Sequence, residues 1–535
     1  MKNKAIIAAA AALLISNLAF AQTKNFKLGQ WTEIQNSILK ELNRSYVDSL
    51  PIDRIERAGI DAMLGDLDPY TVYIPEEENE DLQMMIAKSY GGIGAVIYKP
   101  DKDGNVIINE PYKNSPAEKY GLRCGDEIME IDGVSTHGLT SQESSERMKG
   151  KPGTVVKFKV KKVYTGEIVD IDVTRERIHL PDVEYAGMLD SETGYIYQSG
   201  FTENVSSDIR AAVLDLKKQG MKKLVLDLRG NGGGLMSEAI EIVSLFVPKG
   251  SLVVSSKGQG REQEFKTTKE PIDTQIPIIV MVDSGSASSS EIVTGALQDL
   301  DRATVMGTRT FGKGLVQSIR PLPYNGQLKV TTAKYYTPSG RCVQAIDYAH
   351  RNEDGSVGFI PDSLTHEFKT AHGRTVKDGG GITPDVIIKG HEYSRLTFSL
   401  VYSSIIQDYA IKFAKEHQAI PEDWTMSDAE WKDFVEFAKT KEFDYRSSAK
   451  TYFDQMKKEL ERDGLSEKMS AQIEAMQKAL EMDKETFLNL KKDEIIPFVE
   501  EEIMVRYYFQ EAGIKVRLRY DEQLKEALTK PLISF

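Results

Sequence analysis

The sequence has little cysteine and no metal-binding motif. Among 535 residues there are two cysteines, Cys124 and Cys342, and neither a Cys-x-x-Cys nor a His-x-x-x-His pair occurs. This absence argues against a zinc site or a redox centre, so we predict no metal and no cofactor. The two cysteines lie far apart in the chain. We therefore expect buried free thiols, although an exported protein could form a disulfide.

Long apolar runs are also missing beyond the N-terminus, which excludes a membrane helix there. The first residues, Met1–Ala21, read as a signal peptide: Lys2 and Lys4 precede a short apolar run, and Ala19-Phe20-Ala21 fits a small-x-small cleavage site. We predict cleavage after Ala21 and a periplasmic or secreted protein. The net charge of −13 argues against nucleic acid as a partner.

A chain of this length is too long for one hydrophobic core, and its patterns change along the sequence. After the signal peptide, we predict a helical region, a segment of short strands, an α/β core with a polar, irregular surface insertion, and a charged helical region. The predicted bounds are 22–87, 88–177, 178–393 (insertion 347–378) and 394–535. The last region should pack on the core or on a second copy, with a helix ending near Gly513.

One serine stands at a junction between a strand and a helix. The apolar run Ile276–Asp283 predicts a buried strand, and the apolar spacing after Ser288 predicts an amphipathic helix. Ser288 and Glu291 fit a capping box, so the helix should begin near Ser288. At such a junction the hydroxyl is exposed beside free N–H groups that can stabilise an oxyanion. The alternative is that Ser288 only caps the helix.

Lys313 favours the catalytic interpretation. It lies between Gly312 and Gly314, and glycines allow other parts of the chain to come close. A lysine whose pKa is lowered by burial from about 10.4 towards about 7–8 can take the proton of a serine hydroxyl. Gln317 follows four residues later, where its amide oxygen could orient the lysine.

A second junction carries glycines. The buried strand Leu224–Leu228 runs into Arg229-Gly-Asn-Gly-Gly-Gly-Leu235 and then a helix. The motif lacks the Lys-Ser/Thr of a phosphate loop, and Leu235 breaks a Gly-x-Gly-x-x-Gly pattern. Because strand ends meet at one edge of an α/β sheet, this turn should bring Gly232 or Gly233 opposite Ser288. Each glycine could equally serve only to turn the chain.

Taken together, Ser286-Ala-Ser-Ser-Ser-Glu291, Lys313 and Gln317 resemble the Ser–Lys–Gln arrangement of the carboxyl-terminal-processing (tail-specific) serine proteases, with Ser289 where that family has alanine. The resemblance implies a multidomain α+β protein whose core has crotonase-like ββα repeats. It implies that Ser288, Lys313 and Gln317 are catalytic and that Gly233 and Ser289 supply the oxyanion N–H groups.

The strand-rich segment resembles a PDZ domain. Gly91-Gly-Ile-Gly-Ala95 opens it, and Gly125-Asp-Glu-Ile-Met-Glu-Ile-Asp-Gly133 comes later. In such a loop, the N–H groups of Gly92, Ile93 and Gly94 can bind the terminal carboxylate of a peptide that adds to the sheet edge. The implied protein is an exported serine endopeptidase that binds peptide or protein C-termini.

Two other functions stay open at this point. The first is a catalytically inactive PDZ scaffold or chaperone, against which the intact Ser288, Lys313 and Gln317 argue. The second is a Ser–His–Asp hydrolase. No Gly-x-Ser-x-Gly motif occurs, and none of the seven histidines has a recognisable catalytic setting. His366 and His372, in the insertion, are the nearest candidates.

Overall fold

The structure is a computed structural model that describes residues 25–533 except 79–81, 83, 85, 101–102, 353 and 445–446. The predicted signal peptide lies outside the described residues. Within them, no helix has both the length and the apolar character needed to cross a membrane. The chain divides into two compact units, Met1–Tyr73 and Ile74–Phe535.

The first unit is helical, as the apolar spacing predicts. One helix spans residues 25–45 and a second, α2, spans Ile52–Gly65. The carboxylate of Asp68 then accepts hydrogen bonds from the N–H groups of Tyr70 and Thr71, both at 2.8 Å, which closes a turn after the helix.

The next segment forms a small antiparallel sheet with the strand order β3-β4-β5-β7-β8, and β6 pairs with β5. Its apolar side chains form a separate core around Ile108, Ile128 and Phe158. The first strand of the segment, β2, pairs with its last strand, β9, in a separate two-stranded antiparallel sheet. The element bounds are β2 Ser89–Gly92, β3 Ala95–Tyr98, β4 Val106–Pro111, α4 Pro116–Lys119, β5 Glu127–Ile131, β6 Val134–Ser135, α5 Ser141–Met148, β7 Val155–Lys161, β8 Ile168–Thr174 and β9 Glu176–His179; β1 Val72–Ile74 and η1 Glu76–Glu78 precede them.

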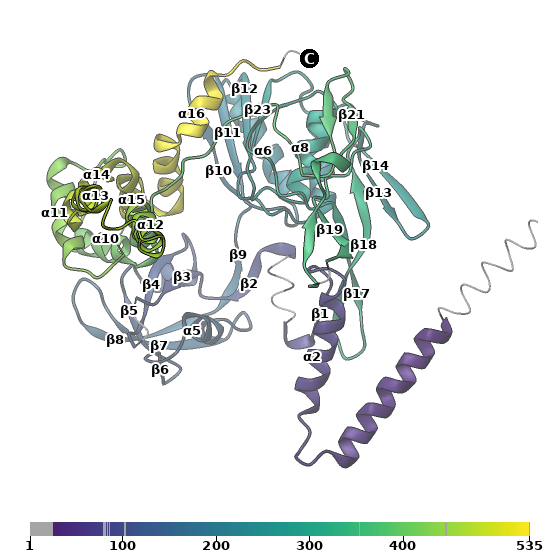
Figure 1. The fold of residues 1–535 in the computed structure, drawn as a ribbon, viewed down its shortest axis with the longest axis horizontal. Coiled ribbons are helices and arrows are strands. Elements are labelled where there is room, and N and C mark those ends of the chain that lie inside the picture. The colour runs from purple at the N-terminus through teal and green to yellow at the C-terminus, as the bar shows by residue number, and fades with distance from the viewer. Residues whose placement is uncertain are drawn as a thin grey trace, which may run out of the picture. The chain divides into compact units, whose positions relative to one another are not determined.

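A six-stranded sheet with the order β10-β11-β12-β15-β16-β23 forms the centre of the α/β core, and all its strands except β10 run parallel. Alternate residues of β12 point to opposite faces: Leu224 and Leu226 pack with helices α6, α7 and α8, and Val225 packs with α16. Both faces are thus covered (Figure 1). The bounds are β10 Val183–Met188, β11 Thr193–Gln198, α6 Val205–Lys218, β12 Lys223–Asp227, α7 Met236–Ser244, β15 Ile278–Val282, α8 Ser289–Asp299, β16 Thr304–Gly307, β23 Val386–Ile387 and α16 Glu522–Thr529.

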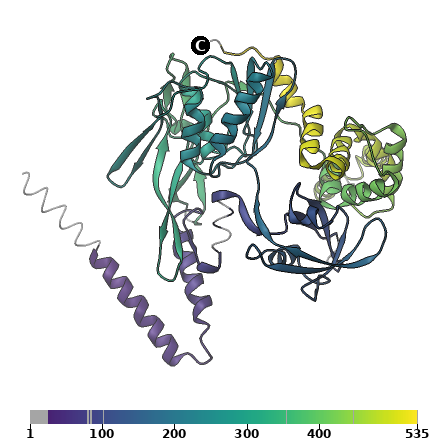
Figure 2. The same ribbon diagram turned by 180° about the vertical axis from the view of Figure 1, so that it is seen from behind.

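A second sheet carries β14, β13, β18 and β17 in that order, and its β17–β18 ribbon is long (Figure 2). The predicted irregular insertion, 347–378, contains two short antiparallel pairs instead, β19 with β20 and β21 with β22. Cross-strand pairs give hydrogen-bond partners to part of its backbone despite its polar sequence. The bounds are β13 Leu252–Gly258, β14 Arg261–Lys266, β17 Leu315–Pro321, β18 Gln327–Tyr336, β19 Ile346–Arg351, β20 Val357–Phe359, η2 Asp362–Leu364, β21 Glu367–Lys369 and β22 Thr375–Lys377.

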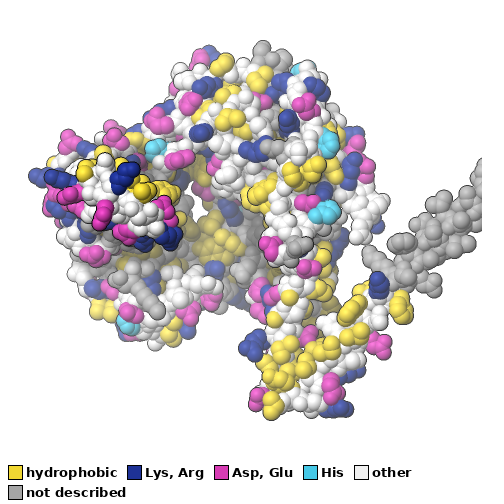
Figure 3. Space-filling view, viewed as in Figure 1, with side chains coloured by type: hydrophobic (Ala, Val, Ile, Leu, Met, Phe, Trp, Pro, Cys, Tyr) yellow, Lys and Arg dark blue, Asp and Glu magenta, His cyan; other side chains and the backbone are white. Residues whose placement is uncertain are grey.

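The C-terminal region is helical, as predicted, and Figure 3 shows charges of both signs interspersed over its surface. The predicted helix end at Gly513 was wrong, because α15 is interrupted at Phe509 instead, where φ is 62°. A Cβ at Gly513 would lie 2.7 Å from Val505, so this glycine allows close packing. The bounds are α9 Arg395–Tyr402, α10 Ile405–Glu416, α11 Asp428–Lys439, α12 Ser448–Arg462, α13 Ser470–Leu480, α14 Lys484–Leu490 and α15 Lys492–Tyr520.

Candidate active site

Ser288 sits in a strained turn between β15 and α8. Its φ of 57° and ψ of −113° place a residue with a side chain in sparsely populated space. Such a conformation costs on the order of 1–3 kcal/mol and persists only where the surroundings hold it. The helix begins at Ser289, as the sequence predicts, and the Glu291 carboxylate accepts the Ser288 N–H at 2.9 Å.

The glycine turn after β12 helps to hold the strained turn at Ser288. The carbonyl of Asn231 accepts hydrogen bonds from the Ala287 N–H at 3.0 Å and from the Ser290 hydroxyl at 2.7 Å. The Ser286 hydroxyl donates to the Leu228 carbonyl at 2.7 Å. The two strand–turn–helix units therefore meet at their turns, which is the arrangement expected from parallel strands.

Glu291 links the serine turn to the lysine loop. Its side chain is fully buried, and besides the Ser288 N–H it accepts hydrogen bonds from the Thr310 hydroxyl at 2.6 Å, the Gly312 N–H at 2.7 Å and the Lys313 N–H at 2.8 Å. Burial raises the pKa of Glu291 above its ordinary value, and the donors oppose that shift. Sequence reasoning assigned Glu291 only to a helix cap. No local pattern could reveal its partners across the fold.

Tyr335 makes a second link between the same two backbones. Its single hydroxyl hydrogen is shared between two carbonyl acceptors, that of Lys313 at 2.7 Å and that of Ser288 at 3.1 Å. Burial raises the pKa of Tyr335 well above its ordinary value, so the hydroxyl stays a donor. Ser288 and Lys313 are thus joined through their N–H groups by Glu291 and through their carbonyls by Tyr335. Lys313 itself is partly buried.

Gln317 lies in β17, two residues after the strand begins. A register shift separates Val316 from Gln317, so simple alternation from Lys313 does not decide which face Gln317 takes. Its amide nitrogen donates to the Thr331 hydroxyl at 3.4 Å. The proposed contact of its amide oxygen with Lys313 stays a prediction.

Gly233 lies directly against the serine turn. Its φ is 92°, and a Cβ there would lie 2.6 Å from the Ala287 carbonyl oxygen and 2.8 Å from the Ser288 Cβ. The Gly233 N–H donates to the Asn231 side-chain oxygen at 2.9 Å. The other predicted oxyanion donor, Ser289, is the first residue of α8, where N–H groups have no partner within the helix.

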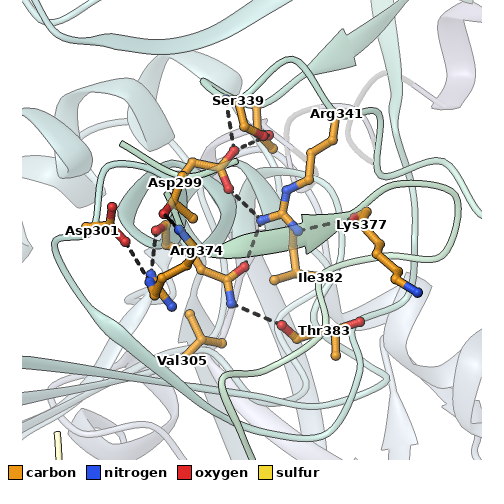
Figure 4. Close-up of polar contacts among 12 residues, drawn as sticks. Asp299, Asp301, Val305, Ser339, Arg341, Arg374, Lys377, Ile382 and Thr383 are labelled. Atoms are coloured by element: carbon orange, nitrogen blue, oxygen red, sulfur yellow. Dashed lines mark hydrogen bonds and ion pairs between the residues drawn. The ribbon is translucent and has the colours of Figure 1, made fainter. Parts of the chain in front are cut away.

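A buried network holds the other end of α8 (Figure 4). Asp299 pairs with Arg341 at 2.7 Å, and both side chains are at most 1% exposed. Arg374 pairs with Asp301 at 2.7 Å, and through this residue the insertion 347–378 contacts the segment after α8. The network supports the site from a distance, because it fixes the far end of the helix that carries Ser288 at its start.

The histidines of the insertion have other partners. His366 lies 3.5 Å from Asp378 and His372 lies 3.4 Å from Asp301, and both side chains are more than 60% exposed. Both cysteines are free, as predicted, and burial raises the pKa of Cys124 to about 11. Among the described residues, no group of three or more His, Cys, Asp or Glu side chains could hold a metal ion.

The glycine loop of the strand-rich segment precedes an edge strand. β3 is the outermost strand of its sheet in the described part of the chain. Gly94 has a φ of 73°, and the carbonyls of Ile93 and Gly94 accept the N–H groups of Ala117 and Tyr112 at 2.8 and 2.9 Å. The loop is thus held on its carbonyl side by the residues around α4.

Three family models match the chain. Peptidase family S41 matches residues 192–351, the PDZ domain matches 82–161, and the probable PDZ-protease C-terminal helical domain matches 396–530. The first match covers strands β11, β12, β15 and β16 of the central sheet and the turns that hold Ser288 and Lys313.

Two relatives and one solved structure are similar to parts of this chain. The carboxy-terminal-processing protease of Bartonella bacilliformis is 38% identical over 318 residues, which are 58% of this chain and 71% of that protein. A probable CtpA-like serine protease of Staphylococcus aureus is 35% identical over 314 residues, which are 58% of this chain and 62% of that protein. The solved photosystem II D1 C-terminal processing protease is 26% identical, with a TM-score of 0.37, over 65% of this chain and 86% of that one.

These matches define a class of protein, a serine-type peptidase that carries a PDZ domain. The chain belongs to the carboxyl-terminal-processing proteases of peptidase family S41. The resemblance, the fold class and the enzyme class predicted from the sequence are confirmed.

Proposed function

We propose that the protein cleaves polypeptides with a Ser288–Lys313 dyad. The observation that carries this proposal is the double link between the two residues: the Glu291 carboxylate accepts both N–H groups, and the Tyr335 hydroxyl shares its one hydrogen between both carbonyls. These contacts hold the two backbones near one another at the start of α8. The strained turn at Ser288 is typical of a functional site.

In the proposed reaction, the neutral Lys313 amine takes the proton of the Ser288 hydroxyl while the oxygen attacks the peptide carbonyl carbon. The N–H groups of Ser289 and Gly233 stabilise the tetrahedral oxyanion, for which Gly233 exchanges its bond to Asn231. The Lys313 ammonium then gives its proton to the leaving amine, and an acyl-enzyme remains. Lys313 deprotonates a water that hydrolyses the ester and regenerates the serine.

Gln317 has an orienting role in this proposal. It belongs to β17, the strand that comes after the lysine loop, and its side chain amide contacts Thr331 on the neighbouring strand β18. Anchored there, its amide oxygen would hold the Lys313 amine towards Ser288. Removing such an orienting group costs about 10–100-fold, less than removing the base itself.

Substrates enter, in this proposal, through the PDZ domain. An edge strand such as β3 can pair with an extended peptide, and the N–H groups of Gly92, Ile93 and Gly94 receive its terminal carboxylate. The substrate class is therefore a polypeptide with an accessible C-terminus. We place the reaction in the periplasm or outside the cell, in line with the apolar N-terminal sequence Met1–Ala21.

The test is cleavage of an unfolded protein by the mature enzyme. We expect Ser288→Ala and Lys313→Ala each to abolish cleavage, while circular dichroism shows an unchanged fold. Amidation of the substrate's C-terminus should raise KM more than it lowers kcat, because it removes the charge that the PDZ loop binds. Full activity of either variant would refute the dyad. An inactive wild-type protein that still binds C-terminal peptides would favour the scaffold function.

A further inference from the structure

Hydrogen bonds connect the start of the C-terminal helix α16 to the turn that carries Gly233. Asp521, directly before α16, accepts two hydrogen bonds from the Arg229 guanidinium, at 2.5 and 3.2 Å. Gln523 accepts a third, at 2.9 Å, and donates to the Ile388 carbonyl at 2.7 Å. Arg229 is the first residue of the glycine turn, so the helical domain contacts this turn four residues before Gly233.

The pair is well shielded from solvent. The side chains of Arg229 and Asp521 are 18% and 17% exposed, and Asp227, at 1%, binds the same guanidinium from inside the core. The Tyr195 hydroxyl in turn donates to Asp227 at 2.7 Å. A guanidinium held by two carboxylates in such surroundings has one fixed orientation, unlike an exposed ion pair.

Apolar packing, not the ion pair, holds α16 on the sheet. Leu524 and Ala527 are almost fully buried against Val225, Met281 and Met306, on the face opposite α8. Replacing Asp521 should therefore leave the helix attached. Asp521 also caps the helix by accepting the Leu524 N–H at 2.8 Å. Asparagine can make the same cap through its amide oxygen, so Asp521→Asn keeps the cap while it removes the charge and one of the two oxygens that accept from Arg229.

A cavity beside the pair leaves Arg229 room to move. It has a volume of about 930 Å³ and is lined by Arg229, Asp521, Tyr197, Phe498 and Arg517, among others. Without the Asp521 charge, Arg229 keeps Asp227 and Gln523 as partners, but its guanidinium is held less firmly towards α16 and has room to shift into the cavity.

We propose that Asp521 is a positioning residue for catalysis, which acts through Arg229 on the turn that presents Gly233 to Ser288. The proposal rests on the proposed Ser–Lys function. It makes the end of the helical domain part of the catalytic apparatus of the protease core. Because the turn serves the oxyanion in the transition state, loss of Asp521 affects kcat and leaves KM unchanged.

The experiment compares Asp521→Asn with Glu522→Gln in the full-length mature protein. Glu522 is the next residue, and its side chain is 76% exposed beside Lys525. We expect Asp521→Asn to lower kcat about 10–100-fold, the range for residues that orient a catalytic group, with KM within about twofold by the same argument. Glu522→Gln should match the wild type. Rates are expressed per active site, titrated with an active-serine probe, so that loss of folded protein is not counted.

A double-mutant cycle tests the route through Arg229. In Arg229→Met, the further change Asp521→Asn should cost nothing more. A normal kcat per titrated site in Asp521→Asn, or fully additive losses in the cycle, would overturn the proposal. Ser288→Ala measured alongside separates the two claims: its full activity refutes the dyad, whereas an inactive Ser288→Ala with an unaffected Asp521→Asn refutes only the positioning role.

Discussion

At the scale of single residues, Glu291 does more for the site than its sequence position indicates. Four donors from two segments, the Ser288 turn and the loop that carries Thr310, Gly312 and Lys313, converge on its carboxylate, which has no solvent contact. Both oxygens are used, so the side chain acts as a junction between the Ser288 turn and the loop of Lys313. A buried acceptor with this many donors is costly to replace, because each donor would lose its partner.

Glu291→Gln tests this role. The amide turns one acceptor into a donor that faces N–H or O–H groups, so at least one donor is left without a partner. We expect a loss of about 1–3 kcal/mol in the free energy of unfolding and of about 10–100-fold in kcat/KM. Chemical denaturation and kinetics measure both. Glu241→Gln, a surface residue of α7 paired with Lys269, serves as the control and should change neither. A Glu291→Gln variant with the stability and activity of the wild type would contradict this account.

The sequence singles out Ser288 and Lys313 as catalytic candidates and Glu291 as a helix cap, but it does not indicate how the three residues are joined. A capping box is a local pattern, so the helix start was predictable from Ser288 and Glu291. The bonds from Thr310 and Gly312 to Glu291, and from Tyr335 to both backbones, depend on the fold and leave no periodic signal. The contacts that join these residues were therefore not predictable from the sequence, and the catalytic roles of Ser288 and Lys313 stay predictions.

At the scale of elements, two strand–turn–helix units meet, and Gly233 is where they touch. The predicted strands and helices of these units are confirmed, because strand, turn and helix signals all lie within short stretches. The close approach of the two turns leaves no room for a side chain at Gly233. At Gly232, by contrast, a Cβ would meet nothing within 4 Å.

We therefore expect Gly233→Ala and Gly232→Ala to differ sharply. Alanine at Gly233 is strained at a φ of 92° and clashes with the Ala287 carbonyl and Ser288, so the turn must shift. The predicted loss in kcat is on the order of 10²-fold, as for the loss of an oxyanion donor. Gly232→Ala should keep nearly full activity. Equal losses in the two variants would show that the clash does not matter.

Element boundaries that depend on tertiary contacts were less predictable. Gly513 looked like a helix end, but its role is close packing against Val505. The polar segment 347–378 looked irregular, yet it forms two short antiparallel pairs, and Arg374 from it binds Asp301. In both places the decisive contact comes from elsewhere in the fold.

At the scale of the whole molecule, the PDZ segment and the C-terminal helices meet at a polar junction. Glu110 of β4 is 5% exposed, and Gln510 of α15 donates to it at 3.4 Å. Burial raises the pKa of Glu110 to about 7, with a smaller contribution from Glu502 and an opposing one from Arg506. A carboxyl group in this state is protonated more readily in the folded chain than in the unfolded one.

The contribution of Glu110 to the free energy of unfolding should therefore fall as the pH rises and this carboxyl group loses its proton. The folded chain binds the Glu110 proton more tightly than the unfolded chain, so folding is favoured below a pH of about 4.5 and this contribution is lost as the pH rises towards 7. Glu110→Gln removes the cost of the buried charge. In calorimetric scans, we expect the Tm of the variant minus the Tm of the wild type to increase between pH 5 and pH 8. A constant difference across that range would contradict the shift.

The most direct test of the central claim is the site and rate of acylation. The mature protein is treated with a fluorophosphonate that labels active serines, and the modified residue is mapped by mass spectrometry. We predict label on Ser288 alone in the wild type, a rate at least about 10²-fold lower in Lys313→Ala, as expected for the loss of a general base, and no label in Ser288→Ala. Label on Ser289 or another serine, or labelling of Lys313→Ala at the wild-type rate, would contradict the Ser288–Lys313 dyad.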